Sequence, residues 1–176
     1  MRFVQNPQLQ FGQVDISKIE FNPKSRDDIP LILKGLQYIY VNREIREKIF
    51  ELLEKNISPH INKKNGRPGM ELWKIFVLGV LRLDLNCDYD RLEELANNHK
   101  TIRQMLGHYD FFDTAKYHIQ TLKDNISLFT PELLDQINQV VVKAGHVLVK
   151  KKRNNSAAWA LRLLCRRDQC PLPNGY

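Results

Sequence analysis

The stretch "MELWKIFVLGVLRLDL" (70–85) is apolar on most of the surface that a helix would present. Such a helix would expose apolar side chains to water on nearly every side, so other elements have to surround it. The neighbouring stretches are suitable partners, because each reads as a helix with a single apolar stripe. We therefore expect 70–85 to be the central helix of an all-α fold.

The surrounding helices are predicted from their periodicity and their start and stop signals. They are expected at 31–40 after Pro30, 43–57 after Asn42, 89–99 after Asp88, 102–107, 115–126 and 131–152. Thr101 (with Gln104 in a capping box), Thr114 and Thr130 are the expected caps of the last three, and Gly107 suits a helix end. The chain shows no βαβ alternation and no internal repeat, so a compact multi-helix domain is predicted.

Three segments follow from these patterns. Residues 1–28 are polar and mixed, and "FGQVDISKIEF" alternates enough for a short strand or an extended N-terminal arm. Residues 29–149 form the helical domain. Residues 150–176 have no apolar period, so they are expected to be a disordered C-terminal tail.

The positive charge of the chain is concentrated in this tail. The net charge is +7, but 150–176 hold seven basic residues against Asp168 alone, while the other residues carry 20 basic and 19 acidic groups. The body of the protein is therefore nearly neutral, and the global charge does not by itself indicate a nucleic-acid partner.

Cysteine usage and hydropathy indicate a cytoplasmic protein. Cys87, Cys165 and Cys170 are odd in number and lack the spacing of a disulfide framework, which favours a reducing compartment. The sequence contains no run of about 18 apolar residues that would span a membrane. The N-terminus lacks the apolar region and cleavage site of an export signal. We expect no membrane partner.

Two stretches are candidates for DNA contact. In 89–107, two capped helices separated by a turn of about four residues have the outline of a helix-turn-helix. The second helix would present Lys100, Arg103 and Gln104 to a major groove, where Arg and Gln read base edges. The basic turn "NKKNGRPG" offers Lys63, Lys64 and Arg67 to phosphates. A helical hairpin inside a bundle and a solvated loop remain open as alternatives.

The residues alone predict no catalytic site, metal site or cofactor. The acids at 84–94 cluster, but Asp88 is explained as a helix cap, and Asp90, Glu93 and Glu94 suit the first turns of a helix. The histidines and cysteines lack zinc-ligand spacing, and no nucleophile is paired with a base. Trp73, on the central helix, is expected in the core.

Four strings together resemble the N-terminal part of bacterial insertion-sequence transposases, in the DDE group usually labelled ISNCY. They are "GQVDISKIEF", "SRDDIPLILKGLQYIY", "GRPGMELWKIFVLGVLRLDLNCDYDRLEELANNHKTIRQMLGH" and "VVKAGHVLVKKK". The resemblance covers residues 1 to about 152. It implies that the helical region engages the terminal repeats of the element or supports assembly. It also implies a following ribonuclease-H-like domain, whose three carboxylates bind two Mg²⁺ ions.

The chain departs from the family after "VKKK". Family members continue with something like "LRGRCDSYVVETNVHYPTD", whereas residues 159–176 read "WALRLLCRRDQCPLPNGY". With suitable codons, the same bases read one position later encode "GRCDSYVVETNVHYPTD". We expect the tail to be the first catalytic strand read out of frame, with the slip near 150–156, where lysine codons form an adenine run. The chain would then lack the catalytic triad and would not be an enzyme, unless a frameshifted fusion is made.

Three functions remain open at this point. The chain could bind the ends of the element as the N-terminal portion of a transposase. It could be a protein–protein module that inhibits or assembles with full-length transposase, or with itself, through the apolar stretches 31–40 or 71–81. It could also be the non-functional remnant of a decayed gene, which rapid turnover would support.

Overall fold

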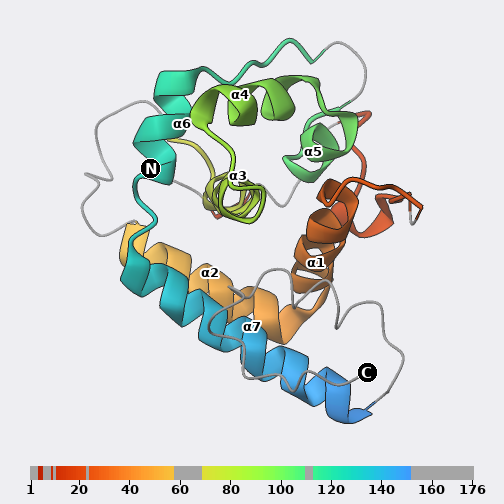
Figure 1. Cartoon of the computed structure of the whole chain (residues 1–176), viewed down its shortest axis with the longest axis vertical. Helices are drawn as coiled ribbons and strands as arrows, with labels where there is room; N and C mark the ends of the chain where they lie inside the picture. Colours follow the sequence, from red (N-terminus) through yellow and green to blue (C-terminus); the bar gives the residue numbers. More distant parts are fainter. Residues whose placement is uncertain are drawn as a thin grey trace.

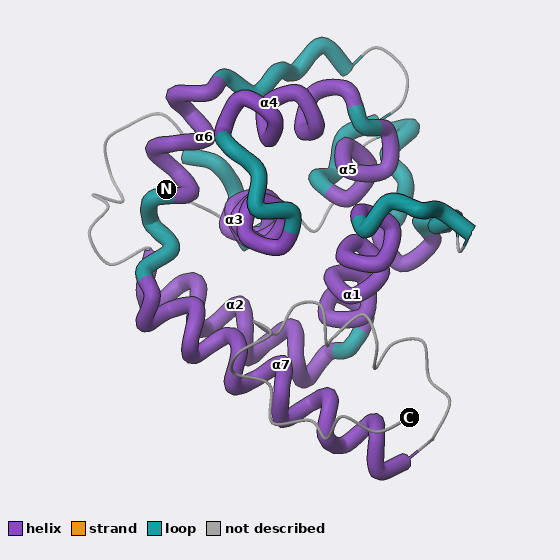
Figure 2. Tube along the Cα trace, viewed as in Figure 1, coloured by secondary structure: helices purple, strands orange, loops and turns teal. Residues whose placement is uncertain are grey.

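The computed structural model describes residues 4–5, 9, 11–22, 24–57, 69–109 and 113–151, with side chains described as far as Ala144. Its elements are the 3₁₀ turn η1 (Ile16–Lys18) and the helices α1 (Ile29–Val41), α2 (Arg43–Ile57), α3 (Leu72–Asp84), α4 (Tyr89–Asn98), α5 (Lys100–Met105), α6 (Ile119–Ile126) and α7 (Pro131–Lys151). These ranges contain no strand, only an isolated bridge between Gln13 and Tyr109 (Figure 2). The all-α prediction is confirmed.

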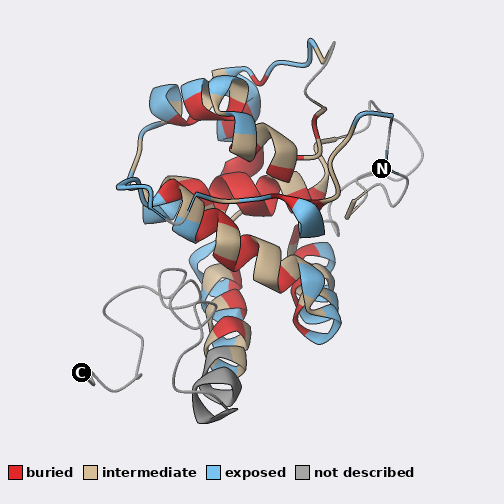
Figure 3. Ribbon diagram, turned by 90° about the vertical axis from the view of Figure 1, so that its right-hand side faces the viewer, coloured by how far each residue is buried: buried red, intermediate tan, exposed pale blue. Residues whose placement is uncertain are grey.

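Helix α3 lies at the centre, as its composition predicts. Figure 1 shows it nearly end-on, with the other helices arranged around it. Eight of its thirteen residues are buried, so most of its surface is covered (Figure 3). The indole of Trp73 packs against the rings of Tyr40, Phe50 and Phe76, with centroid separations of 5.1, 6.1 and 5.8 Å. The expected core position of Trp73 is confirmed.

Helices α2 and α7 lie side by side and antiparallel (Figure 1). Asn56, near the end of α2, donates to Gln136, near the start of α7, at 3.4 Å. Two of the predicted caps are confirmed here: the Asn42 side chain accepts from the Ile45 amide at 3.3 Å, and Thr130 Oγ1 accepts from the Leu133 amide at 3.3 Å. Both helices therefore begin where their local sequence predicts.

The two apolar stretches considered as docking surfaces are part of the core. The inward face of α1 is almost completely buried at Ile32, Leu33, Leu36 and Ile39, and most of the corresponding stretch of α3 is buried as well. These buried side chains enclose α3, so a partner could reach only the parts of the two stretches that remain at the surface. On α1 only Leu31 and Val41 remain as exposed large apolar side chains, at 43% and 56%.

The described part of the N-terminal segment packs against α1. Ile16 and Ile19 are buried, and the Gln37 amide donates to the carbonyls of Ile16 and Ile19 at 2.8 and 2.9 Å. The expected extended arm therefore contains a 3₁₀ turn at Ile16–Lys18, and the hydrogen bonds from Gln37 hold this turn against α1. At the other end of the chain, α7 runs to Lys151, so the expected tail 150–176 starts inside a helix; residues 152–176 lie outside the described residues.

Candidate functional site

Three of the six predicted DNA contacts lie on one short helix. Lys100, Arg103 and Gln104 belong to α5, where Lys100 is exposed and the other two are partly buried. Lys63, Lys64 and Arg67 lie outside the described residues. The structure therefore places one of the two predicted contact regions and leaves the basic turn a prediction.

The junction between α4 and α5 is tighter than the sequence suggests. A single residue, His99, ends α4 and begins α5, in place of the expected turn of about four residues. The His99 side chain accepts from the Ile102 amide at 3.3 Å through Nδ1, so His99 is the cap and Thr101 lies inside the helix. The predicted Thr101 capping box is wrong, because the helix begins at Lys100, ahead of Thr101, and the imidazole of His99 caps the Ile102 amide instead.

The inward face of α5 is fixed to the core. Ile102 and Met105 are fully buried, and the Trp73 indole N–H donates to the Met105 carbonyl at 3.0 Å. The helix ends at Met105, and Gly107 follows its C-cap with φ +81°, as suits the predicted stop; a β carbon there would come within 2.9 Å of the Gln13 side-chain amide nitrogen. Helix α5 is thus held at its side and at its end.

Arg103 is turned toward the protein. Its guanidinium donates to the carbonyls of Ala115 at 3.1 Å and Asp113 at 3.3 Å, and lies 3.5 Å from the Asp113 carboxylate. Only 16% of its side chain is exposed. The expectation that Arg103 faces a base edge is not met in this conformation, because the guanidinium holds the segment after α5.

A buried relay joins Asp113, His108 and Tyr117. His108 Nδ1 contacts an Asp113 carboxylate oxygen, and Nε2 lies 2.7 Å from the Tyr117 hydroxyl. Burial lowers the pKa of His108, against the opposing pull of Asp113. Burial alone would raise the pKa of Asp113, but the Ala115 amide, His108 and Arg103 outweigh it and lower that pKa. This favours a neutral imidazole that donates from Nδ1 to Asp113 and accepts the tyrosine proton at Nε2.

The relay is suited to holding structure in place. Nε2, the nitrogen that would act as a general base, is already occupied by Tyr117, and burial raises the pKa of that tyrosine further above its usual range. A tyrosine with a raised pKa is rarely deprotonated at neutral pH and is therefore a poor nucleophile. The Asp113–His108–Tyr117 relay therefore joins the end of α5 to the segment that follows it.

Residues 113–118 form an irregular segment beside α4, in place of the predicted helix start (Figure 2). Asn97 of α4 pairs with both main-chain groups of Tyr117, at 2.8 Å each, and Glu93 accepts from the Ile119 amide at 3.2 Å. Helix α6 consequently begins at Ile119 after His118, and the predicted cap at Thr114 is wrong. Side chains of α4 and α5 stabilise this conformation, and within the segment the Asp113 side chain accepts from the Ala115 amide at 2.9 Å, a local turn that aspartate commonly forms.

A cleft that no sequence pattern indicates lies between α3 and α7. It has a volume of about 560 Å³, and its lining combines apolar residues such as Phe76, Val80 and Phe129 with polar ones such as Arg82, Asp135 and Asn138. Asp84 also lines the cleft; although the residue is exposed, partial desolvation of its carboxyl group raises the pKa of Asp84 to about 7. The cleft is a second candidate site.

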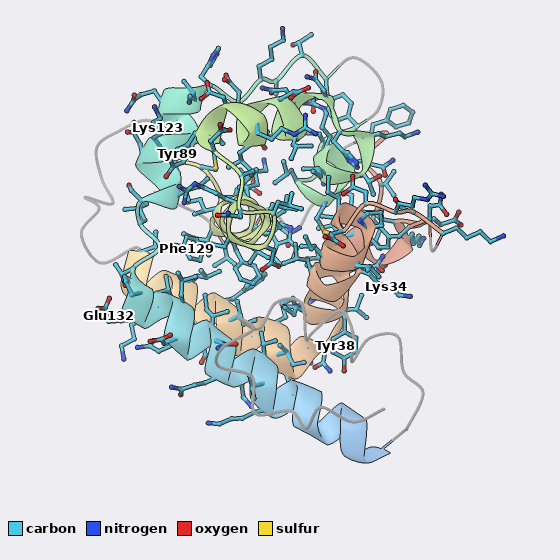
Figure 4. The ribbon with its side chains drawn as sticks, viewed as in Figure 1. Lys34, Tyr38, Tyr89, Lys123, Phe129 and Glu132 are labelled. Atoms are coloured by element: carbon cyan, nitrogen blue, oxygen red, sulfur yellow. The ribbon has the colours of Figure 1, made fainter. Side chains whose placement is uncertain are left out.

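Two cationic side chains contact the ring of Tyr89, and one of them, Arg82, also lines this cleft. The Arg82 guanidinium lies over the Tyr89 ring at 4.3 Å from its centroid, and the Lys123 ammonium lies 5.9 Å from the same centroid. Figure 4 shows Tyr89 of α4 next to Lys123 of α6. Cation–π contacts of this kind stabilise the packing of α3, α4 and α6.

The clustered acids have structural roles. The Asp88 carboxylate accepts from the Arg91 amide at 2.8 Å, which confirms the predicted cap of α4, and Glu94 pairs with Arg91 at 2.6 Å. Within the described ranges, no three His, Cys, Asp or Glu side chains come together in an arrangement that could hold a metal ion.

Comparisons with protein-family models, with curated proteins and with solved structures found no match for this chain. Among the described residues, no helix combines the length and apolar content needed to cross a bilayer.

Proposed function

We propose that this chain is the N-terminal helical portion of an ISNCY-type insertion-sequence transposase and that it binds DNA at the ends of the element. The proposal starts from the resemblance over residues 1 to about 152, above all its long string ending at His108. From residue 69 onward this string forms one packed unit of α3, α4 and α5. The family's catalytic carboxylates are not assigned to any residue here, so the proposed role is to bind DNA and not to cut it.

The placement of Lys100 carries the DNA-binding role. This lysine is exposed at the start of α5, while the opposite face of the helix is locked to α3 through Ile102, Met105 and the Trp73 hydrogen bond. A cation on a rigid surface element suits a phosphate contact, which positions a protein on a duplex. Because Arg103 is turned inward, α5 is better suited to the backbone than to base edges.

The test measures binding of the full chain to two duplexes by fluorescence anisotropy over a salt series. One duplex carries the terminal repeat of the element, and the other has a scrambled sequence. Lys100→Ala should weaken binding to both alike and reduce the salt slope by about 1. Lys48→Ala on α2 is a matched control, because Lys48 is also an exposed helical lysine. A wild-type chain that binds neither duplex would reject the proposal.

Base reading by Arg103 is tested separately. If this arginine reads a base, Arg103→Ala should cost about 1–3 kcal/mol on the terminal-repeat duplex and less on the scrambled one. The variant also releases Ala115 and Asp113, so its free energy of unfolding has to be measured alongside. Equal binding of wild type and variant to both duplexes would exclude the reading role.

A second candidate function is assembly with full-length transposase or with another copy of this chain, which would inhibit or support transposition. The cleft between α3 and α7 favours it, because a surface cleft of about 560 Å³ with both apolar and polar lining residues can receive side chains of a partner. Leu83 lines this cleft and is 41% exposed, and Leu31 on α1 is a matched control at 43%. Leu83→Glu should abolish co-purification with full-length transposase, and Leu31→Glu should not. Loss with both variants, or with neither, would count against the cleft.

The proposed frame slip near 150–156 is tested at the level of the gene. Sequencing several hundred bases downstream should show the rest of a ribonuclease-H-like domain in the next frame. If that frame is absent, the tail was not produced by a slip, and its basic residues become candidates for DNA or partner contact.

A further inference from the structure

We propose that the segment 113–118 is a DNA-backbone track, in which Thr114, Lys116 and His118 contact the phosphates of one strand. The inference rests on the proposed DNA binding and adds a surface that the sequence did not indicate. These three residues are exposed, and they alternate with Asp113, Ala115 and Tyr117, whose main-chain groups are hydrogen-bonded; Ala115 is exposed as well.

The backbone of the track is fixed at both ends. Arg103 binds the carbonyls of Asp113 and Ala115, and Asn97 binds both main-chain groups of Tyr117. The relay through His108 holds the side chains of Asp113 and Tyr117. A segment held in this way loses little conformational entropy on binding, which favours a preorganised contact surface.

The outward side chains are suited to phosphate oxygens. A hydroxyl, an ammonium and an imidazole can each donate a hydrogen bond, and all three groups are common partners of the DNA backbone. None of them makes a hydrogen bond or ion pair within the part of the chain that the structure describes. Three acids near the segment are engaged: Asp113 with His108 and Arg103, Glu93 with the Ile119 amide, and Glu71, which acts on Tyr117, with Lys74 at 3.6 Å.

The track lies next to the exposed end of α5. Arg103 is one helical turn after Lys100, and its hydrogen bond to Ala115 places the neighbouring Lys116 beside the same helix. The proposal therefore includes Lys100 and Lys116 as two exposed cations, linked through Arg103 and Ala115, on one DNA-facing surface. This arrangement also gives Arg103 a role as a positioning residue, since it orders the segment that carries Lys116.

The experiment compares wild type, Lys116→Ala and the double variant Thr114→Ala/His118→Ala in the same anisotropy assay with both duplexes. Losing one phosphate contact should lower affinity about fivefold to tenfold at roughly 0.1 M salt, and the salt slope should fall by about 1 for Lys116→Ala. The loss should be equal on the two duplexes, because phosphates carry no base identity. Lys116→Arg should retain binding, and Lys48→Ala should leave it unchanged.

The outcomes separate this inference from the broader proposal. If wild type binds DNA and both track variants bind equally well, the track is wrong while DNA binding stands. A loss confined to the terminal-repeat duplex would also overturn it, since that pattern indicates base reading. If wild type binds neither duplex, the proposed function fails and the track fails with it. Circular dichroism melting verifies that the variants are folded.

Discussion

The indole N–H of Trp73 donates a 3.0 Å hydrogen bond to the Met105 carbonyl, which joins the central helix α3 to the last residue of α5. Both residues are at most 1% exposed, so water cannot replace this bond. The carbonyls at a helix C-terminus lack partners within their own helix, and Trp73 supplies one from another element. The bond therefore sets where α5 lies on the core.

Trp73→Phe should destabilise the protein by about 1–3 kcal/mol, because it leaves a buried carbonyl without a donor. Urea unfolding measures the loss. Hydrogen exchange should show faster exchange at the Arg103 and Leu106 amides of α5 than at amides of α2, because the lost bond is local. A uniform increase in exchange over both helices would indicate a general packing defect and contradict the assignment.

Tyr117→Phe should cost about 1–3 kcal/mol although it removes only one oxygen atom. The hydroxyl donates to His108 Nε2 at 2.7 Å, and its loss leaves a buried nitrogen without a partner. Tyr109→Phe is a control outside the relay. Thermal unfolding of the two variants should differ, and an equal effect would show that the relay does not contribute to stability.

Asp84→Asn should stabilise the protein at pH 8 and have little effect near pH 4. The cleft raises the pKa of Asp84 to about 7 from a model-compound value of 3.8, so the unfolded chain ionises first as the pH rises. Stability consequently falls between about pH 4 and pH 7, and an amide avoids that fall. Asp135→Asn, on the α7 wall, is the control. Unfolding curves at both pH values test this, and a benefit at pH 4 would contradict it.

His108 should produce the opposite pH dependence. Because burial lowers its pKa from 6.5, the unfolded chain takes up the proton first, and stability falls as the pH drops below about 6.5. The effect is best measured in the Asp84→Asn background, where the carboxyl no longer titrates in that window. An NMR titration of the imidazole should give a pKa below 6.5, and a value above 6.5 would mean that Asp113 outweighs burial.

Gly79→Ala should stabilise the protein less than helix propensity suggests. Alanine in place of a helical glycine is worth about 1 kcal/mol, but a β carbon here would lie 3.3 Å from Cε2 of Phe129. With the smaller side chain of Phe129→Leu beside it, the same substitution should give nearly the full gain. A double-mutant cycle measures the coupling, and additive effects would show that the ring yields without cost.

Local sequence patterns determined the helices that have apolar stripes and conventional caps. Helix α3 is central because a helix that is apolar all round has to be enclosed, and Asn42, Asp88 and Thr130 cap their helices because each has an oxygen one turn before an unpaired amide. These features depend on residues close together in the sequence, so they can be predicted from the sequence alone.

Tertiary contacts decided the region around α5. Thr114 has a suitable cap residue type, but Asn97 and Arg103 hold 113–118 in an irregular conformation and delay the next helix to Ile119. The sequence predicts that Arg103 is exposed and contacts DNA. In the structure its guanidinium is directed inward, where it donates to carbonyls ten and twelve residues away along the chain. Hydrogen bonds between separate elements determine the conformation of 113–118 and the direction of the Arg103 side chain. Local sequence patterns do not predict these bonds, because the bonds form only once α4 and α5 have packed on the core.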